Sequence, residues 1–275
     1  MYFYRSIFNP MISFNRKIKN RAKKINSYLC VGIDVDPVLV KSNEFDDLVS
    51  HSKKIVDATR DIALCYKPNF AFFERWGARG FKWLEDIVNY IGEDAIVIAD
   101  AKRGDIGNTA KQYAESIFNY FGFDCVTLNP YMGEDSIKPF IDFEEKGVFI
   151  LCRTSNPSAD TFQSQNLIGG DHIYEQVAKW ANDLNSKDNV GLVVGATAPK
   201  ELSKVRELAP DLPILIPGIG VQGGDLNNCV FEGNKTGIGI INVSRDISFS
   251  GDCSEKSIRE SALSYVEKIN EALIG

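Results

Sequence analysis

Residues 95–105 read AIVIADAKRGD, in which five apolar residues lead directly into alternating charges. The apolar run has the length of a buried strand. Residues two apart in an extended chain point the same way, so we expect Asp100 and Lys102 to project together from the strand end, with Asp105 opening the next element. In barrels and doubly wound sheets the ligand crevice lies at that end of the strands. A solvated loop with alternating charges has the same spacing, so the other strand ends must decide.

Short apolar runs of this kind recur along the chain, and each is followed by a longer stretch with helical periodicity. This alternation predicts a parallel sheet covered by helices. The eight runs are residues 28–33, 62–66, 95–99, 125–128, 147–152, 191–194, 214–216 and 237–242. Eight such units predict an α/β fold of the (β/α)8 TIM-barrel type in a single domain. A doubly wound sheet usually carries a GxGxxG turn after its first strand, whereas residues 32–37 read GIDVDP.

The N-terminal segment, residues 14–25, predicts a helix that closes the bottom of the barrel. Phe14, Ile18, Ala22 and Ile25 fall on one helical face. We expect residues 1–14 to be a dispensable extension and residues 15–275 to form the barrel domain. The first 33 residues hold seven bases and no acid, which also resembles a transit peptide, but the helical face favours the barrel.

Composition excludes several classes of protein. The chain has 275 residues, 44% of them hydrophobic, and a net charge of −6, so a broad basic surface for nucleic acid is absent. We expect no membrane partner, because no apolar stretch is long enough to cross a bilayer. The six cysteines form no CxxC pair and there are two histidines, which predicts buried reduced thiols, no zinc site and a cytoplasmic location.

Polar residues follow most of the predicted strands. Ionisable groups that converge from several strand ends of one barrel indicate an active site, since a packed core excludes them. The polar residues that follow the predicted strands are Asp34, Lys67, Asn69, Asp100, Lys102, Asn129, Thr154, Ser155 and Arg245.

The turns after the last two strands suit a phosphate group. Residues 217–225 read PGIGVQGGD, and glycines let backbone N–H groups approach phosphate oxygens. Arg245 would supply the fixed charge and Gln222 a further hydrogen bond. The alternative is that these glycines only turn the chain.

The long loop from Thr154 to Asp171 is rich in small polar residues, as in a lid that closes over substrate. Ser155 would then contact a flat polar ligand. A passive surface loop has the same composition.

The lysines and aspartates at the strand ends form an alternating network in which opposite charges keep each other ionised. It contains Lys67, Lys102, Asp34, Asp100 and Asp105. Such a network can stabilise negative charge that develops on carbon, with Lys102 delivering the proton, and it needs no electron-sink cofactor. The alternative is a structural ion-pair cluster at the barrel rim.

Four motifs resemble the orotidine 5′-phosphate decarboxylase family. They are the DxKxxD pattern of residues 100–105, its extension DIGNT at 105–109, KPNFAFF at 67–73 and TSNP at 154–157, and the last three are similar to the longer-chain subgroup. DxKxxD is shared with 3-keto-L-gulonate-6-phosphate decarboxylase and hexulose-phosphate synthase. Those magnesium-dependent relatives carry a glutamate at the end of strand two, so Lys67 favours the metal-free enzyme.

The resemblance implies conversion of orotidylate to UMP and CO2 in pyrimidine biosynthesis, with no cofactor. It implies that Asp34 and Lys67 bind the ribose hydroxyls beside Asn69, that Asp100 faces the departing carboxylate, that Lys102 protonates C6, that Ser155 reads the pyrimidine edge, and that Gln222 and Arg245 hold the phosphate. It also implies a homodimer in which Asp105 and Thr109, four residues apart on one helical face, reach into the neighbouring subunit's site.

Two residues depart from the pattern of the family. Ser155 stands where some relatives have threonine, and Ser244 stands where a glycine often precedes the phosphate arginine. The second departure puts the backbone donors at the phosphate in doubt.

Two other functions stay open on the sequence alone. A magnesium-dependent sugar-phosphate lyase or decarboxylase would lose activity in EDTA. A catalytically silent nucleotide-binding module would bind UMP tightly without turnover.

Overall fold

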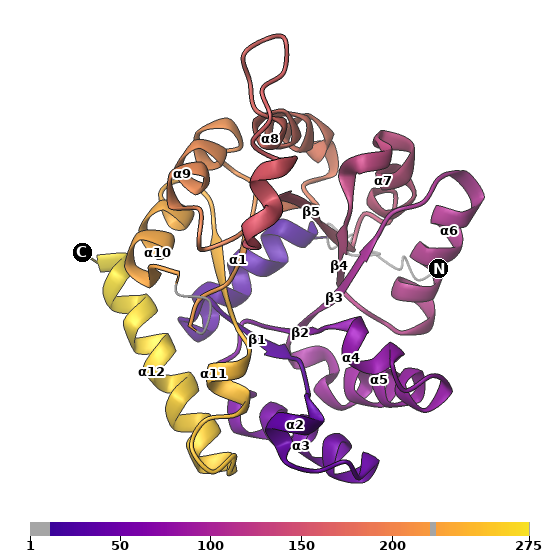
Figure 1. The fold of residues 1–275 in the computed structure, drawn as a ribbon, viewed down its shortest axis with the longest axis vertical. Coiled ribbons are helices and arrows are strands. Elements are labelled where there is room, and N and C mark those ends of the chain that lie inside the picture. Colours follow the sequence, from indigo (N-terminus) through magenta and orange to yellow (C-terminus); the bar gives the residue numbers. More distant parts are fainter. Residues whose placement is uncertain (1–11, 221–223, 275) are drawn as a thin grey trace, which may run out of the picture.

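The strands close into a single parallel barrel. The computed structural model describes residues 12–220 and 224–274. Its strands pair in chain order and β1 closes on β8, which confirms the predicted TIM barrel (Figure 1). They are β1 (Leu29–Ile33), β2 (Cys65–Pro68), β3 (Ile96–Arg103), β4 (Cys125–Leu128), β5 (Gly147–Arg153), β6 (Val190–Val194), β7 (Ile214–Pro217) and β8 (Gly239–Val243).

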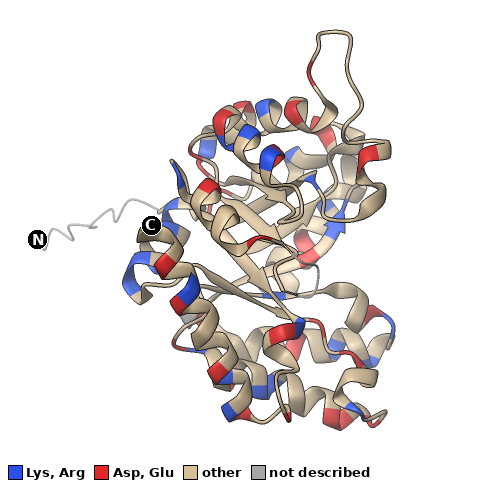
Figure 2. Ribbon diagram, turned by 60° about the vertical axis from the view of Figure 1, so that its left-hand side comes forward, with Lys and Arg blue, Asp and Glu red and all other residues tan. Residues whose placement is uncertain are grey.

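Helices cover the outside of the barrel. Between them and the strands lies an apolar layer that includes Leu84, Val126 and Leu202, all fully buried. Lys and Arg are interspersed with Asp and Glu over the outer helices (Figure 2). The longer helices are α3 (Phe45–Thr59), α5 (Ala78–Ile91), α6 (Gly107–Glu115), α7 (Glu134–Ile141), α8 (Ile173–Leu184), α9 (Pro199–Leu208), α10 (Leu226–Asn234) and α12 (Glu255–Ile274), and the short ones are α2 (Pro37–Val40), α4 (Phe70–Glu74) and α11 (Arg245–Ser248). Within the described ranges, no helix is both long enough and apolar enough to cross a membrane.

Two strands differ from the predicted runs in a way that matters for the site. The third was expected to end at Ala99, but β3 continues to Arg103, whose carbonyl accepts a hydrogen bond from Asn129 N at 2.8 Å. The second was expected from Ile62, but the backbone N–H groups of Ile62 and Ala63 still bond to Thr59 at the end of α3. At its other end, β2 continues beyond the expected residue 66 to Pro68, so Lys67 lies within β2. In the same way, Asp100 and Lys102 lie within β3 rather than just beyond it.

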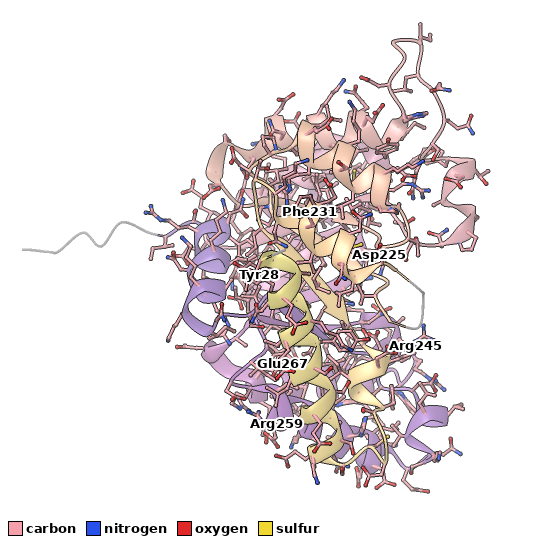
Figure 3. The ribbon with its side chains drawn as sticks, turned by 90° about the vertical axis from the view of Figure 1, so that its left-hand side faces the viewer. Tyr28, Asp225, Phe231, Arg245, Arg259 and Glu267 are labelled. Carbon is pink, nitrogen blue, oxygen red and sulfur yellow. The ribbon has the colours of Figure 1, made fainter. Side chains whose placement is uncertain are left out.

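The N-terminal helix α1 (Phe14–Ile25) closes the bottom of the barrel, as predicted. The ring of Phe14 packs edge-on against Phe149 with centroids 6.4 Å apart. A Cβ on Gly147 would come within 2.0 Å of the Phe14 ring, so glycine permits this close approach. Figure 3 shows Tyr28, which precedes β1, and Arg245, which follows β8, toward opposite ends of the barrel.

The predicted extension of residues 1–14 falls mainly on residues 1–11, which lie outside the described part of the chain. The helix itself begins at Phe14, one residue before the predicted start of the barrel domain, and the Ser13 side chain caps it by accepting a hydrogen bond from Arg16 N.

Replacing Phe14, which packs against the bottom of the barrel, should destabilise the fold. Phe14 is 1% exposed, and Phe14→Ala should lower the free energy of unfolding by about 3–5 kcal/mol because it leaves a cavity against the barrel interior. Urea denaturation measures the change. Ile12→Ala is the control, since Ile12 is 55% exposed and should cost less than about 0.5 kcal/mol. Equal losses in the two variants would show that α1 does not seal the barrel.

Candidate active site

A polar cavity of about 190 Å³ opens at the carboxyl ends of the strands. Six of the predicted site residues line it: Asp34, Lys67, Asn69, Asp100, Ser155 and Arg245. They come from the ends of β1, β2, β3 and β5 and from the first residue of α11 after β8. The closed barrel therefore gathers at one place residues that lie more than two hundred positions apart in the sequence.

The centre of the cavity wall is a carboxylate shared by two ammonium groups. Asp100 Oδ2 lies 2.6 Å from Lys67 Nζ, and Asp100 Oδ1 lies 2.5 Å from Lys102 Nζ. Asp100 is 9% exposed and Lys67 4%, whereas the Lys102 side chain is 51% exposed. Lys67 is thus a buried partner of Asp100, whereas Lys102 is half exposed and is not itself among the residues that line the cavity.

Burial disfavours the charged forms of Lys67 and Asp100, but attraction between their opposite charges outweighs the effect of burial. Burial by itself would lower the pKa of Lys67, yet the carboxylates of Asp100 and Asp34 outweigh it and raise that pKa. Burial would raise the pKa of Asp100, yet Lys67 and Lys102 outweigh it and hold that pKa well below its usual range. Asp100 and Lys67 are therefore both ionised throughout the neutral range.

Strand β3 has a bulge at Asp100 and Lys102, two of the candidate catalytic residues. Ala99 pairs with Val126 and Arg103 with Leu128, so three residues of β3 face one residue of β4. Within this bulge Lys102 adopts a left-handed backbone with φ +46°. The bulge turns Lys102 so that its ammonium returns to the Asp100 carboxylate.

Asp34 has unused hydrogen-bonding capacity. Its Oδ1 is buried and has no hydrogen-bond partner among the described residues, although the side chain lines the cavity. A buried carboxylate oxygen without a donor is costly, so a ligand hydroxyl is the fitting partner.

Part of the cavity lining has the features of an anion site. Pro217, Gly218, Ile219 and Arg245 are among the residues that line the cavity. Gly218 has φ +99°, which only glycine adopts without strain. Gln222, predicted to bind phosphate, lies outside the described residues.

Serine is accommodated where the family pattern has glycine before the arginine. A Cβ on Gly32 would come within 1.9 Å of Ser244 Oγ, so the Ser244 side chain occupies space that Gly32 leaves open on β1.

The loop after β5 is anchored at its start. Ser155 packs against Gly195, where an added Cβ would meet the Ser155 backbone at 2.7 Å. Arg153, only 7% exposed, bonds Asp160 at 2.6 Å, and Thr154 N donates to Gln163 Oε1 at 2.8 Å. The distal part projects away from the barrel (Figure 1).

Asp105 and Thr109 do not join the cavity within one chain. Asp105 is half-buried and its Oδ1 accepts a hydrogen bond from Ile106 N, while Thr109 is exposed on the first turn of α6. Neither is among the residues that line the cavity.

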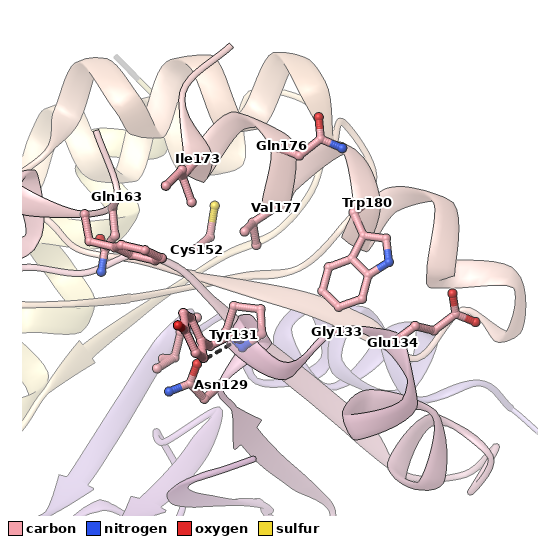
Figure 4. Close-up of a pocket in the computed structure, with 13 residues that line it drawn as sticks. Asn129, Tyr131, Gly133, Glu134, Cys152, Gln163, Ile173, Gln176, Val177 and Trp180 are labelled. Carbon is pink, nitrogen blue, oxygen red and sulfur yellow. Dashed lines mark hydrogen bonds between the residues drawn. The ribbon is translucent and has the colours of Figure 1, made fainter. Parts of the chain in front are cut away.

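A larger pocket of about 740 Å³ is lined by residues of η3 (Pro130–Met132) and α8 and shares no lining residue with the polar cavity. Figure 4 shows Trp180, Val177 and Cys152 facing it. Asn129 lines this pocket, and its Oδ1 accepts a hydrogen bond from Tyr131 N at 3.0 Å. Asn129 therefore does not join the charged cluster, although it ends a strand.

Three polar residues at the site escaped the sequence prediction. Asn242 and Asp246 line the polar cavity, and Thr127 bonds the bulge of β3. Asn242 and Thr127 stand inside apolar strands, which is the signal that could have singled them out. Asp246 directly follows Arg245, and its carboxylate accepts a hydrogen bond from Tyr265 Oη at 2.8 Å.

The sequence matches a known family over most of its length. The sequence model of the orotidine 5′-phosphate decarboxylase / HUMPS family matches residues 27–259. The chain belongs to this family. An orotidine 5′-phosphate decarboxylase from Halorubrum lacusprofundi is 44% identical over 260 residues, which are 89% of this chain and 91% of that protein.

Solved structures of the family have the same fold. The OMP decarboxylase of Leishmania donovani superposes with a TM-score of 0.85 at 37% identity, over 96% of this chain and 99% of that one. The UMP synthase of the same organism gives a TM-score of 0.87 at 38% identity, but there this chain spans only 57% of the longer protein.

Removing the shared carboxylate should cost stability in a pH-dependent way. Asp100→Asn should lower the free energy of unfolding by about 3–5 kcal/mol at pH 7, because it leaves a buried ammonium at Lys67 without its partner. A depressed pKa stabilises the fold above the unfolded value and loses that effect as pH falls toward the folded one. The difference from wild type should therefore shrink below about pH 4.

Urea denaturation at several pH values measures this difference. Asp86→Asn is the control, since Asp86 is 49% exposed in its ion pair with Lys82 and should change stability by less than about 0.5 kcal/mol. A penalty at Asp100 that stayed constant down to pH 3 would contradict the assignment.

Proposed function

We propose that the chain converts orotidylate to UMP and CO2 in pyrimidine biosynthesis, with no metal or coenzyme. The observation that carries this proposal is the pair of ammonium groups on Asp100, which lines a cavity that Arg245 also lines. An ammonium 2.6 Å from the carboxylate repels a divalent cation, which disfavours the magnesium chemistry of the sugar-phosphate relatives.

The reaction breaks the bond between C6 and the carboxylate and leaves the electron pair on C6. The ring delocalises that pair poorly, so its stabilisation must be electrostatic. The Lys102 ammonium faces the developing charge and then transfers one proton to C6, becoming a neutral amine that solvent reprotonates. Asp100 fixes this ammonium and lies against the departing carboxylate.

The rest of the cavity would bind the remote parts of the substrate. The unpaired Asp34 Oδ1 suits a ribose hydroxyl, with Lys67 and Asn69 beside it. Ser155 would contact the pyrimidine edge, while Arg245 and Gln222 would hold the phosphate. Binding energy from the phosphate would then help to organise the reacting centre.

A second copy of the chain would complete the site. Lys102 is half exposed in one chain, and Asp105 and Thr109 lie outside the cavity. In a homodimer that joins the mouths of two barrels, Asp105 and Thr109 of each chain would reach the other's site. Exposed apolar residues near this edge support such a contact: Ile106, Tyr131 and Met132.

The cysteines support the cytoplasm as the location of the enzyme. All six are free, and five of them are buried, as suits a reducing compartment.

Replacing Lys102, the proposed proton donor, should abolish turnover of orotidylate but largely preserve binding of UMP. Lys102→Ala should bind UMP within about tenfold of wild type and lose at least about 10³-fold in kcat, because no other ammonium replaces it at C6. The loss of orotidylate absorbance in the ultraviolet, with and without EDTA, measures turnover. Lys82→Ala, on the exposed face of α5, is the control with unchanged kcat. Substantial turnover in Lys102→Ala refutes the donor role, and loss of wild-type activity in EDTA favours a metal-dependent relative.

Shared sites predict complementation between two inactive chains. In a mixed dimer of Lys102→Ala and Asp105→Ala subunits, one site pairs an intact Lys102 with an intact Asp105. Random mixing should restore about a quarter of wild-type activity, since about half of the dimers are mixed and each has one working site. Subunit exchange is verified with differently tagged chains. If exchange occurs without any recovery, Asp105 does not act across the interface.

A further inference from the structure

The bulge of β3 leaves backbone groups that the strand ladder does not satisfy. Between the paired positions Ala99 and Arg103, three residues of β3 face the single residue Thr127 of β4. Two backbone N–H groups in this bulge, those of Ala101 and Lys102, both donate to Thr127 Oγ1, at 3.1 and 3.0 Å. One side-chain oxygen thus replaces the backbone carbonyl that a regular ladder would offer.

The hydroxyl of Thr127 uses its full hydrogen-bonding capacity here. A hydroxyl accepts two hydrogen bonds and donates one. Thr127 Oγ1 accepts the two N–H groups, and its own proton points to Asp100 Oδ1 at 3.3 Å or to Ala99 O at 3.4 Å. Thr127 is 2% exposed, whereas the Lys102 side chain is 51% exposed, so we expect Lys102 but not Thr127 to reach a ligand.

The same hydroxyl holds Lys102 in a backbone conformation that lysine disfavours. Lys102 has φ +46°, and a non-glycine residue keeps such a φ only where its surroundings impose it. Lys102 N donates a hydrogen bond to Thr127 Oγ1 of the neighbouring strand at 3.0 Å, which is a contact suited to hold this backbone.

We propose that Thr127 is a positioning residue for catalysis: its hydroxyl fixes the left-handed backbone of Lys102, and this aims the ammonium at the reacting carbon while it stays paired with Asp100. The inference rests on the proposed decarboxylation for its kinetic consequence. Its structural part, the dependence of the Lys102 conformation on Thr127, stands without it.

The test compares Thr127→Val with Thr127→Ser. Valine keeps the shape and removes the hydroxyl, so kcat for orotidylate should fall about 10²-fold, the scale of a misplacement by about 1 Å. KM and the Kd for UMP should stay within about threefold, because Thr127 does not touch the ligand. Thr127→Ser restores the oxygen and should recover kcat to within about fivefold of wild type. Thr127→Ala carries the same expectation as valine if the valine variant does not fold.

The matched control is Thr59→Val. Thr59 is fully buried in α3, and its Oγ1 bonds Ile55 O and the Tyr66 hydroxyl away from the cavity. It should lose stability as Thr127→Val does but keep kcat. The inference is overturned if Thr127→Val keeps kcat, if Thr59→Val loses as much, or if serine fails to restore activity.

A crystal structure of Thr127→Val separates this inference from the proposed function. Lys102 should leave the left-handed region and its ion pair with Asp100 should lengthen. If Lys102 keeps φ near its present value, the positioning role is wrong even where wild type decarboxylates orotidylate. If wild type has no such activity but Lys102 moves, the proposed function fails and the structural inference holds.

Discussion

A single buried carboxylate, Asp100, organises the mouth of this barrel. Each of its oxygens pairs with a different lysine, at 2.6 Å from Lys67 and 2.5 Å from Lys102. Taking such charges out of water costs several kcal/mol per ion, and mutual attraction offsets that cost only when the geometry is close. Buried ion pairs are therefore weak contributors to stability, and a cluster of three charges at a cavity is better understood as a device for holding an ammonium in place.

The barrel supplies this cluster because adjacent parallel strands end at the same level. Lys67, Asp100 and Thr127 come from three consecutive strands, β2, β3 and β4. A regular β3 would present alternate side chains to the interior, but the bulge inserts residues that β4 does not match. The unusual backbone is local and lies at Lys102, the residue that we propose as the proton donor, and such backbone outliers are common at functional sites.

The sequence alone was sufficient for the barrel and for much of the charged cluster. Most of the eight apolar runs ended in polar residues, and the closed sheet brought Asp34, Lys67 and Asp100 to one cavity. The bulge was not predictable, because it depends on the register between β3 and β4 and no residue type in β3 indicates it. Thr127 was missed for a related reason: threonine is an ordinary strand residue, and its role appears only when the unmatched N–H groups opposite are known. Asp105 and Thr109 cannot be placed at the site from one chain, since the residues around them do not line the cavity.

The carboxylates of Asp100 and Asp34 differ in the hydrogen-bonding capacity that each has left for a ligand. Both oxygens of Asp100 are committed to lysines, so Asp100 has little capacity left to accept a hydrogen bond from a ligand hydroxyl. Asp34 keeps a buried oxygen without a donor among the described residues, so it can accept a hydroxyl without breaking an existing bond. Lys67 lies close enough to both carboxylates for their charges to raise its pKa. One buried ammonium is thus shared, in a cavity of about 190 Å³, between a carboxylate whose two oxygens are both paired and a carboxylate that keeps an oxygen for a ligand.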